Sequence, residues 1–295
     1  MSWQLAVLLR GLRHVARPRL QHVKEPITAR IGFERLARVG CRPPPYLCHV
    51  HDSAGMDRIH VGRPARGKII LFLHGGGYIA GSPNSYAAML GRLSLLSGLE
   101  ICAPDYRLAP EHRFPAAYDD ACAAWDHLVS MGYAPSDIVI GGDSAGGGLA
   151  IALLSHLCRA GTPPAGLFAM SPWCDLSLTG ESLTRNANAD PFLPAKRIRE
   201  LVGYVLPEGE DAEDPRLSPL FADFPDCPPV LLHYGQTEIL LDDCRRMAAR
   251  LRAHGADVTE TVHPSAPHVW HLFDGWIPEA RRSLCDISYF ARACL

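Results

Sequence analysis

The sequence predicts an α/β fold in which a mostly parallel sheet is covered by helices on both faces. From about residue 68 to the end, short β-rich apolar runs alternate with longer segments of helical periodicity. Several of the runs are apolar throughout and stop at glycine or proline, as strands buried on both faces do. Alternation of such strands with helices is typical of a sheet whose strands run parallel.

The individual elements follow in order along the chain. The expected strands are "KIILFL", "LEICAPDY", "DIVIG", "AGLFAM", "PPVLLHYG" and "DVTETVH". The expected helices are Tyr86–Leu96, Tyr118–Met131, Ala145–Arg159 and Ile239–His254.

Two regions stand outside this alternation. Residues 1–40 have the pattern of helix without strand, and residues 175–227 are rich in Pro, Asp and Asn with a helical piece near Lys196–Val205. Open α/β sheets place their sites at the carboxyl edge of the strands. We therefore expect one domain over residues 1–295, in which these two regions form a helical cap over that edge.

Composition and charge exclude several classes of protein. The chain has 295 residues, 47% hydrophobic and 20% charged, with a formal net charge of −2. This balance gives no electrostatic case for binding nucleic acid, and no apolar run is long enough for stable membrane insertion. The first twenty residues place an apolar stretch before the arginines, unlike a secretory signal. They predict an amphipathic helix of the fold, with association at a membrane surface as the alternative.

The ten cysteines are scattered and form no CxxC pair. Several of them lie among apolar neighbours, as buried free thiols do. In the absence of an export signal, this pattern predicts reduced cysteines in a cytoplasmic protein.

A candidate nucleophile lies in "GDSAG", Gly142 to Gly146. The motif follows the strand "DIVIG" and opens an apolar helix, which is the context that a nucleophilic serine on a tight strand-to-helix turn requires. The glycines leave room for neighbouring elements, and the helix N-terminus favours the negative charge of acyl transfer. The alternative is a glycine-rich turn in which Ser144 merely caps the helix. We expect Ser144 to be the nucleophile.

A candidate oxyanion hole lies in "HGGGY", His74 to Tyr78, directly after the first strand of the alternation. Consecutive glycines allow backbone N–H groups to point into a cavity that a β-carbon would obstruct. We assign the N–H groups of Gly76 and Gly77 to this hole, together with that of Ala145 after the nucleophile. His74 is expected to hold the loop rather than to act as a base.

These motifs resemble a known family. HGGGY, then "YRLAPEHRFPAAYDDA" (Tyr106–Ala121), then GDSAG is the signature order of the hormone-sensitive-lipase-like esterases of the α/β-hydrolase fold. The resemblance covers about residues 30–290. It implies that the N-terminal helices and the 175–227 insertion together cover the site, and "DPFL", Asp190–Leu193, resembles a cap segment of this family.

The base is expected near the C-terminus, because in this fold the triad runs in the order Ser, acid, His. The stretch "HPSAPHVWHLF" offers His263, His268 and His271. His268 follows the last strand and a proline-containing loop, and it matches the base position of the resembled family. His263 is expected to end the strand, and His271 to be a partly exposed surface residue.

Three carboxylates compete for the role of the acid: Glu238, Asp242 and Asp243. Glu238 stands at the carboxyl end of a strand, whereas the two aspartates fall in the first turn of a helix, where they complement its dipole. In the resembled family the first acid of an acid-x-L-x-D motif pairs with the histidine, and Glu238 aligns there in place of the commoner Asp. We expect Glu238 to be the acid, ahead of Asp242 and then Asp243.

The resulting prediction is a serine carboxylesterase for short- to medium-chain esters, which needs neither a metal nor an organic cofactor. Its expected partner is a small-molecule ester, and a homodimer is the alternative to a monomer. The expected substrate pocket includes Tyr78, Trp173, Phe192 and Leu193. The alternatives are a lactone hydrolase, an amide hydrolase acting in the same site, and a non-catalytic small-molecule receptor on this fold.

Overall fold

The computed structural model describes residues 1–22, 25–52 and 55–295. Its centre is an eight-stranded sheet in the order β1-β2-β4-β3-β5-β6-β7-β8. β2 runs antiparallel to both of its neighbours, β1 and β4, and the pairs from β4 to β8 in this order are parallel. The predicted α/β fold is confirmed. The strands are β1 Leu47–His51, β2 Met56–Val61, β3 Ile69–Leu73, β4 Glu100–Pro104, β5 Ile138–Asp143, β6 Gly166–Met170, β7 Val230–Gly235 and β8 Val258–His263.

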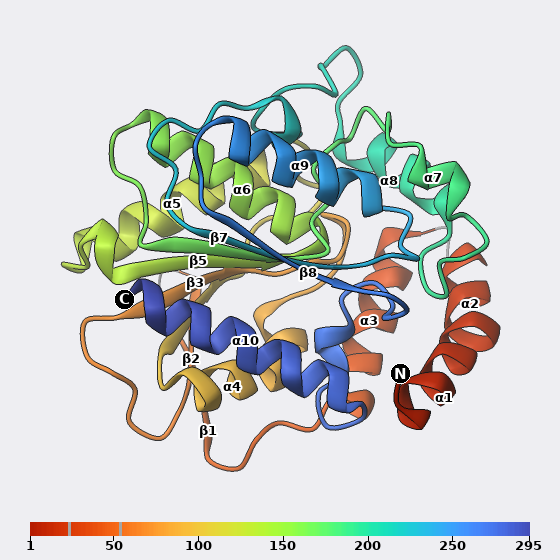
Figure 1. The fold of residues 1–295 in the computed structure, drawn as a ribbon, viewed down its shortest axis with the longest axis horizontal. Coiled ribbons are helices and arrows are strands. Elements are labelled where there is room, and N and C mark those ends of the chain that lie inside the picture. The colour runs from red at the N-terminus through yellow and green to blue at the C-terminus, as the bar shows by residue number, and fades with distance from the viewer. Residues whose placement is uncertain (23–24, 53–54) are drawn as a thin grey trace.

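Helices cover both faces of this sheet. α5, α6 and α9 lie on one face, and α4 and α10 lie on the other (Figure 1). Outside the sheet layers lie α1, α2, α3, α7 and α8. The helices are α1 Trp3–Gly11, a π-helical turn Leu12–Ala16, α2 Arg17–His22, α3 Pro26–Gly40, α4 Pro83–Ser97, α5 Ala116–Ser130, α6 Ser144–Arg159, α7 Ser182–Arg185, α8 Ala195–Val205, α9 Leu241–Ala253 and α10 Pro278–Cys294, with 3-10 turns at Pro135–Asp137, Pro219–Phe221 and Trp270–Phe273.

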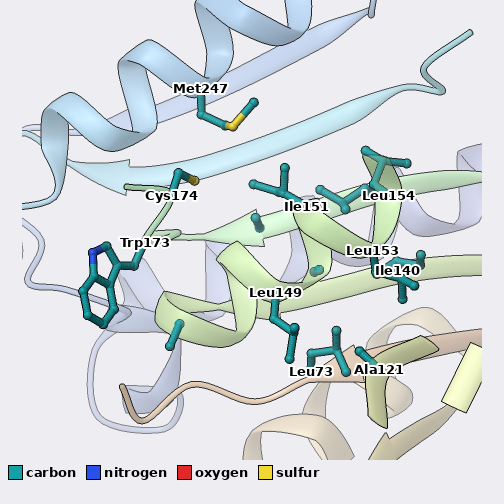
Figure 2. Close-up of a cluster of buried hydrophobic side chains, with 14 of the residues drawn as sticks. Leu73, Ala121, Ile140, Leu149, Ile151, Leu153, Leu154, Trp173, Cys174 and Met247 are labelled. Atoms are coloured by element: carbon teal, nitrogen blue, oxygen red, sulfur yellow. The ribbon is translucent and has the colours of Figure 1, made fainter. Parts of the chain in front are cut away.

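The core lies on both sides of the sheet because successive side chains of a strand point to opposite faces. In β3, Leu71 faces the cluster that contains α5, α6 and α9, whereas Phe72 faces the cluster of α4 and α10. Figure 2 shows the first cluster around α6, where Leu149 and Leu153 lie close to strand residues. A helix that is apolar on most of its sides is buried in this way.

The two regions expected to form a cap lie next to each other. The Arg13 guanidinium donates a hydrogen bond to the carbonyl oxygen of Ala189 at 3.0 Å, and that of Arg17 donates to Ala187. α1–α3 and α7–α8 are neighbours at the right of Figure 1. None of the helices among the described residues is both long and apolar enough to cross a bilayer.

Two parts of the fold were not predicted. The antiparallel pair β1 and β2, residues 47–51 and 56–61, extends one side of the parallel sheet. α10, Pro278–Cys294, covers one face of the sheet with Leu284, Ile287 and Ala291. Both elements carry many polar residues, so the periodic pattern of their few apolar residues is weak in the sequence.

Candidate active site

Ser144 lies at a sharp turn between β5 and α6. Its φ is +52°, in the left-handed region that a non-glycine residue rarely adopts. The two flanking glycines make the turn possible: a β-carbon on Gly142 would lie 2.3 Å from the carbonyl oxygen of Gly146, and one on Gly146 would lie 2.2 Å from that of His74. The strand and the helix therefore approach so closely that the serine is raised above the sheet's carboxyl edge.

The structure brings Ser144, His268 and Glu238 together from three separate loops. The Ser144 Oγ lies 2.8 Å from Nε2 of His268. The other ring nitrogen, Nδ1, lies 2.7 Å from Oε2 of Glu238. The order serine, imidazole, carboxylate is the geometry of a nucleophile, a base and the group that orients the base.

The carboxylate of Glu238 is completely buried. Its second oxygen, Oε1, accepts hydrogen bonds from the Ser171 hydroxyl at 2.8 Å and from the backbone N–H of Gly235 at 2.5 Å. The same Ser171 hydroxyl oxygen accepts from the N–H of Val269, next to His268, at 3.2 Å. Ser171 thus ties the acid loop to the histidine loop, a role that the sequence analysis missed.

The other two acids make different contacts. Asp242 accepts from the N–H of Ser182 at 2.8 Å and pairs with Arg185 at 2.7 Å. Asp243 is buried and accepts from the N–H groups of Cys174 and Asp175, both at 3.0 Å. Both aspartates therefore attach α9 to the chain that follows β6, in the insertion region, rather than contacting the imidazole.

The other two histidines also have their own partners. His263 ends β8, and its Nδ1 accepts from the N–H of Ala266 at 2.8 Å. His271 is not the exposed residue that was expected: it is fully buried, with its Nε2 3.1 Å from Nδ1 of His233. The short 3-10 turn Trp270–Phe273 carries His271 into the interior.

The charges around His268 favour its protonated form. Burial on its own would lower the pKa of His268, but the hydrogen bond and negative charge of Glu238, with smaller contributions from Asp190 and Asp143, raise it above the ordinary value. Asp143, immediately before the serine, is itself buried, and burial raises its pKa to about 7. The hydrogen bond and the negative charge of Glu238 therefore stabilise the imidazolium that forms when His268 takes a proton.

The HGGG loop is held in place by buried groups. Oδ1 of Asp143 accepts from the N–H of Gly75 at 2.8 Å. His74 places its Nδ1 2.8 Å from the carbonyl oxygen of Gly75, and its ring stacks on Tyr106 with centroids 4.3 Å apart. Burial lowers the pKa of His74 to about 4, so this ring is neutral near pH 7. These contacts agree with the expectation that His74 holds the loop.

The three residues assigned to the oxyanion hole lie in the HGGG loop and in the first turn of α6. Gly76 and Gly77 have φ of +124° and +64°, which only glycine adopts without strain. Ala145 lies in the first turn of α6, where backbone N–H groups have no partner within the helix. A β-carbon on Gly77 would lie 2.8 Å from Cδ1 of Leu201, so α8 of the insertion between β6 and β7 reaches the loop.

The four residues expected to line a pocket have different surroundings. Tyr78 and Trp173 are buried, and the Trp173 indole N–H donates to the carbonyl oxygen of Asp175 at 3.1 Å. Phe192 and Leu193 are half-buried. A small cavity beside Tyr78 is also lined by Phe114, Leu149 and Val205.

The insertion between β6 and β7 also contacts the acid loop. The buried Asp190 accepts from the N–H of Ile239 at 2.9 Å, through one carboxylate oxygen. The Asn186 side-chain amide donates to the carbonyl oxygens of Gln236 at 3.0 Å and of Glu238 at 2.8 Å. The loop that carries Glu238 is therefore held on its outer side by this insertion.

Comparisons with known proteins agree with this architecture. The family described as the α/β-hydrolase fold matches residues 70–272. An acetyl-hydrolase of Streptomyces hygroscopicus is 39% identical over 233 residues, which cover 78% of each chain. An esterase of Acinetobacter venetianus is 36% identical, covering 76% of this chain and 74% of the relative.

A solved structure extends the likeness to the whole chain. An esterase from the bacterial hormone-sensitive lipase family is 34% identical and superposes with a TM-score of 0.92, covering 99% of this chain and 98% of its own. The match to the α/β-hydrolase family spans more than half of the chain. The chain therefore belongs to the α/β-hydrolase family, as a carboxylic ester hydrolase of the hormone-sensitive-lipase-like group.

Proposed function

We propose that this ester hydrolase acts through Ser144 as nucleophile, His268 as general base and acid, and Glu238 as the group that orients the imidazole. The continuous hydrogen-bonded chain from the serine hydroxyl to the buried carboxylate carries this proposal. It supplies both ends of the imidazole with partners, so that Nδ1 keeps its proton while Nε2 is free to accept one.

The proposed reaction begins with attack of the Ser144 Oγ on the ester carbonyl carbon, while Nε2 of His268 takes the hydroxyl proton. The carbonyl oxygen becomes an oxyanion, to which the N–H groups of Gly76, Gly77 and Ala145 donate hydrogen bonds. The C–O bond to the alcohol then breaks, and the alcohol leaves with the proton from His268. Water, deprotonated by the same imidazole, attacks the acyl-serine. The bond from the acyl carbon to the Ser144 oxygen then breaks, the imidazolium returns the proton to that oxygen, and the acid is released.

The proposed substrates are esters with short acyl chains. Leu201 of α8 packs close to Gly77, and the half-buried Phe192 and Leu193 lie in the insertion that holds the acid loop. Apolar side chains at this place leave limited room and favour small apolar acyl groups. The relative named as an acetyl-hydrolase supports the same substrate class.

The test is a rate profile on p-nitrophenyl esters of increasing acyl length, with the wild type and Ser144→Ala. We expect the highest kcat/KM on short acyl chains and loss of turnover in the variant. Matched lactone and anilide substrates separate ester hydrolysis from the two other hydrolytic activities. Full turnover by a folded Ser144→Ala variant would remove Ser144 from the mechanism.

We further infer that the enzyme works in the reducing cytoplasm. All ten cysteines have free thiols, and reducing compartments keep thiols in that state. Fractionation of the source cells followed by thiol counting under denaturing conditions tests this inference, and a disulfide in the native enzyme would contradict it.

A further inference from the structure

Two histidines and an aspartate converge on the β1–β2 hairpin. His49 and His51 are two residues apart on β1, so their side chains lie on the same face of the sheet. On β2, Asp57 pairs directly with His51 in the antiparallel register. The hairpin register therefore places three possible metal ligands together, outside the site already described.

The side chains point at one another. Nδ1 of His51 lies 2.6 Å from Oδ1 of Asp57, and Nε2 of His49 is hydrogen-bonded to Oδ2. The ligand atoms of the three residues all lie within 4.8 Å of one another. The two imidazole rings have their centroids 4.9 Å apart.

The three side chains differ in how much of their surface is exposed to solvent. The Asp57 side chain is 4% exposed, that of His49 is 17% exposed and that of His51 is 63% exposed. A buried carboxylate requires a compensating positive partner, and here both of its oxygens face imidazole nitrogens. The exposed His51 leaves one side of the cluster open to solvent, through which an ion can enter.

We propose that His49, His51 and Asp57 bind one divalent transition-metal ion, of which Zn²⁺ is the representative. Two imidazoles and one carboxylate are a ligand set that Zn²⁺ uses, with water in the remaining position. Ca²⁺ and Mg²⁺ prefer sites made of oxygen ligands and do not suit this cluster. Binding requires the nitrogen–oxygen distances to open to about 3.4 Å, the edge of a tetrahedron with bonds near 2.1 Å. Rotation of the exposed His51 ring provides part of this movement.

The position of the cluster suggests a structural role. Met56, beside Asp57, pairs with Pro104 at the carboxyl end of β4, and the N–H of Asp105 donates to the carbonyl oxygen of Gly55 at 3.1 Å. The next residue, Tyr106, donates its hydroxyl to the carbonyl oxygen of His74 at 2.7 Å. An ion held here would cross-link the edge strand β1 to β2. β2 in turn pairs with β4, whose carboxyl end leads to Asp105 and Tyr106.

The test is isothermal titration of tag-free protein with ZnCl₂ near neutral pH, followed by thermal unfolding. The variants are His51→Ala and Asp57→Asn, and the matched control is His14→Ala, which removes an exposed histidine from the N-terminal helices. His51 is exposed, so its variant is expected to fold even where a change at the buried Asp57 disturbs the hairpin.

We expect one Zn²⁺ per wild-type chain, with binding weakened at least tenfold in His51→Ala and Asp57→Asn and unchanged in His14→Ala. Because an ion that binds only the folded chain stabilises it, saturating Zn²⁺ should raise Tm by about 4 °C at a hundredfold excess over Kd. CaCl₂ and MgCl₂ should give no such shift. Absence of binding, or binding that His51→Ala leaves intact, would show that the cluster is only a hydrogen-bonded His–Asp–His group and would overturn the proposal.

Discussion

Replacement of Glu238 by glutamine tests the proposed triad most directly, because the structure fixes how the new amide must sit. In the wild type, Oε1 accepts from the Ser171 hydroxyl and from the Gly235 N–H. The amide NH₂ cannot take that position, because it would face the Gly235 N–H as a second donor. The amide oxygen must stay there, and the NH₂ group must face Nδ1 of His268.

This orientation places the wrong tautomer in the site. Nδ1, now 2.7 Å from a donor, must accept, so the imidazole carries its proton on Nε2. That proton points at the Ser144 Oγ, 2.8 Å away, and the ring cannot take the hydroxyl proton. Replacing the acid of such a triad by its amide lowers kcat about 10⁴-fold. We expect a fall of about 10³ to 10⁴, or about 4–5.5 kcal/mol of transition-state stabilisation.

The assay is steady-state hydrolysis of p-nitrophenyl acetate, with the loss falling on kcat rather than KM because the interaction is made in the transition state. Asp242→Asn is the matched control: Asp242 pairs with Arg185, so its loss should change kcat less than about threefold. A folded Glu238→Gln variant that keeps a tenth of the wild-type kcat, or a thousandfold loss in Asp242→Asn, would refute the assignment of the acid.

The pH dependence gives a second readout. Only the neutral form of His268 can act as base, so kcat/KM falls as the pH drops through its pKa. Despite burial, which acts to lower it, Glu238 and the nearby acids raise the pKa of His268. Removal of the Glu238 charge should therefore shift the acidic limb of the residual activity to lower pH. An unshifted limb would mean that Glu238 does not control the protonation of the base.

Three further substitutions have defined outcomes. Gly77→Ala should lower kcat/KM about 10²-fold, because its β-carbon would lie 2.8 Å from Cδ1 of Leu201 at a φ of +64°, and Leu201→Ala should recover part of the loss in the double variant. Ser171→Ala removes a hydrogen bond to the Glu238 carboxylate worth about 1.5–3 kcal/mol and should lower kcat about tenfold or more, measured on the same ester. Burial raises the pKa of the Asp243 carboxyl from 3.8 to about 7. Its contribution to the free energy of unfolding is therefore fully present below pH 3.8, where the carboxyl is protonated in both states, and is lost as the pH rises through 7. Asp243→Asn should therefore gain stability relative to the wild type from about pH 5 to pH 8, by roughly 2–4 kcal/mol, in paired thermal melts; a constant difference would contradict this reasoning.

The fold and the three triad candidates could be predicted because each has a local signal. Buried parallel strands are continuous apolar runs, and glycines mark the turns at which Ser144 and the HGGG loop stand. The order of the triad along the chain then limits the base and the acid to a few residues each. The hairpin of residues 47–61 also has a signal, the alternation in "LCHVH" and "MDRIHV", but its polar positions mask the strand pattern.

The contacts that support the site could not be predicted in the same way, because they join residues far apart in the chain. Ser171 and Glu238 are 67 residues apart, and Asp190 and Ile239 are 49 apart. No local pattern distinguishes these polar side chains from surface residues. Only the pairing of β6 with β7 and the return of the insertion over the sheet edge bring them together.

In the proposed triad, a glutamate takes the place of the commoner aspartate because the geometry of the acid loop fits the longer side chain. The side chain folds back over its own strand, so that Oε1 meets the N–H of Gly235 and a β-carbon on that glycine would lie 3.1 Å from Oε1 and 3.3 Å from Cγ. A β-carbon on Gly235 would lie closer still, 2.4 Å, to the carbonyl oxygen of Ala266, so the absence of a side chain there makes room for the histidine loop as well as for the Glu238 side chain. Asn186 and Asp190 hold the backbone of the acid loop from outside. An aspartate at the same backbone position would be shorter by roughly 1.3 Å and could not keep both Gly235 and His268 as partners. The acid loop therefore depends on three features together: the length of Glu238, the glycine at position 235, and the contacts that Asn186 and Asp190 make from the insertion. A change in any one of them requires a change in the others.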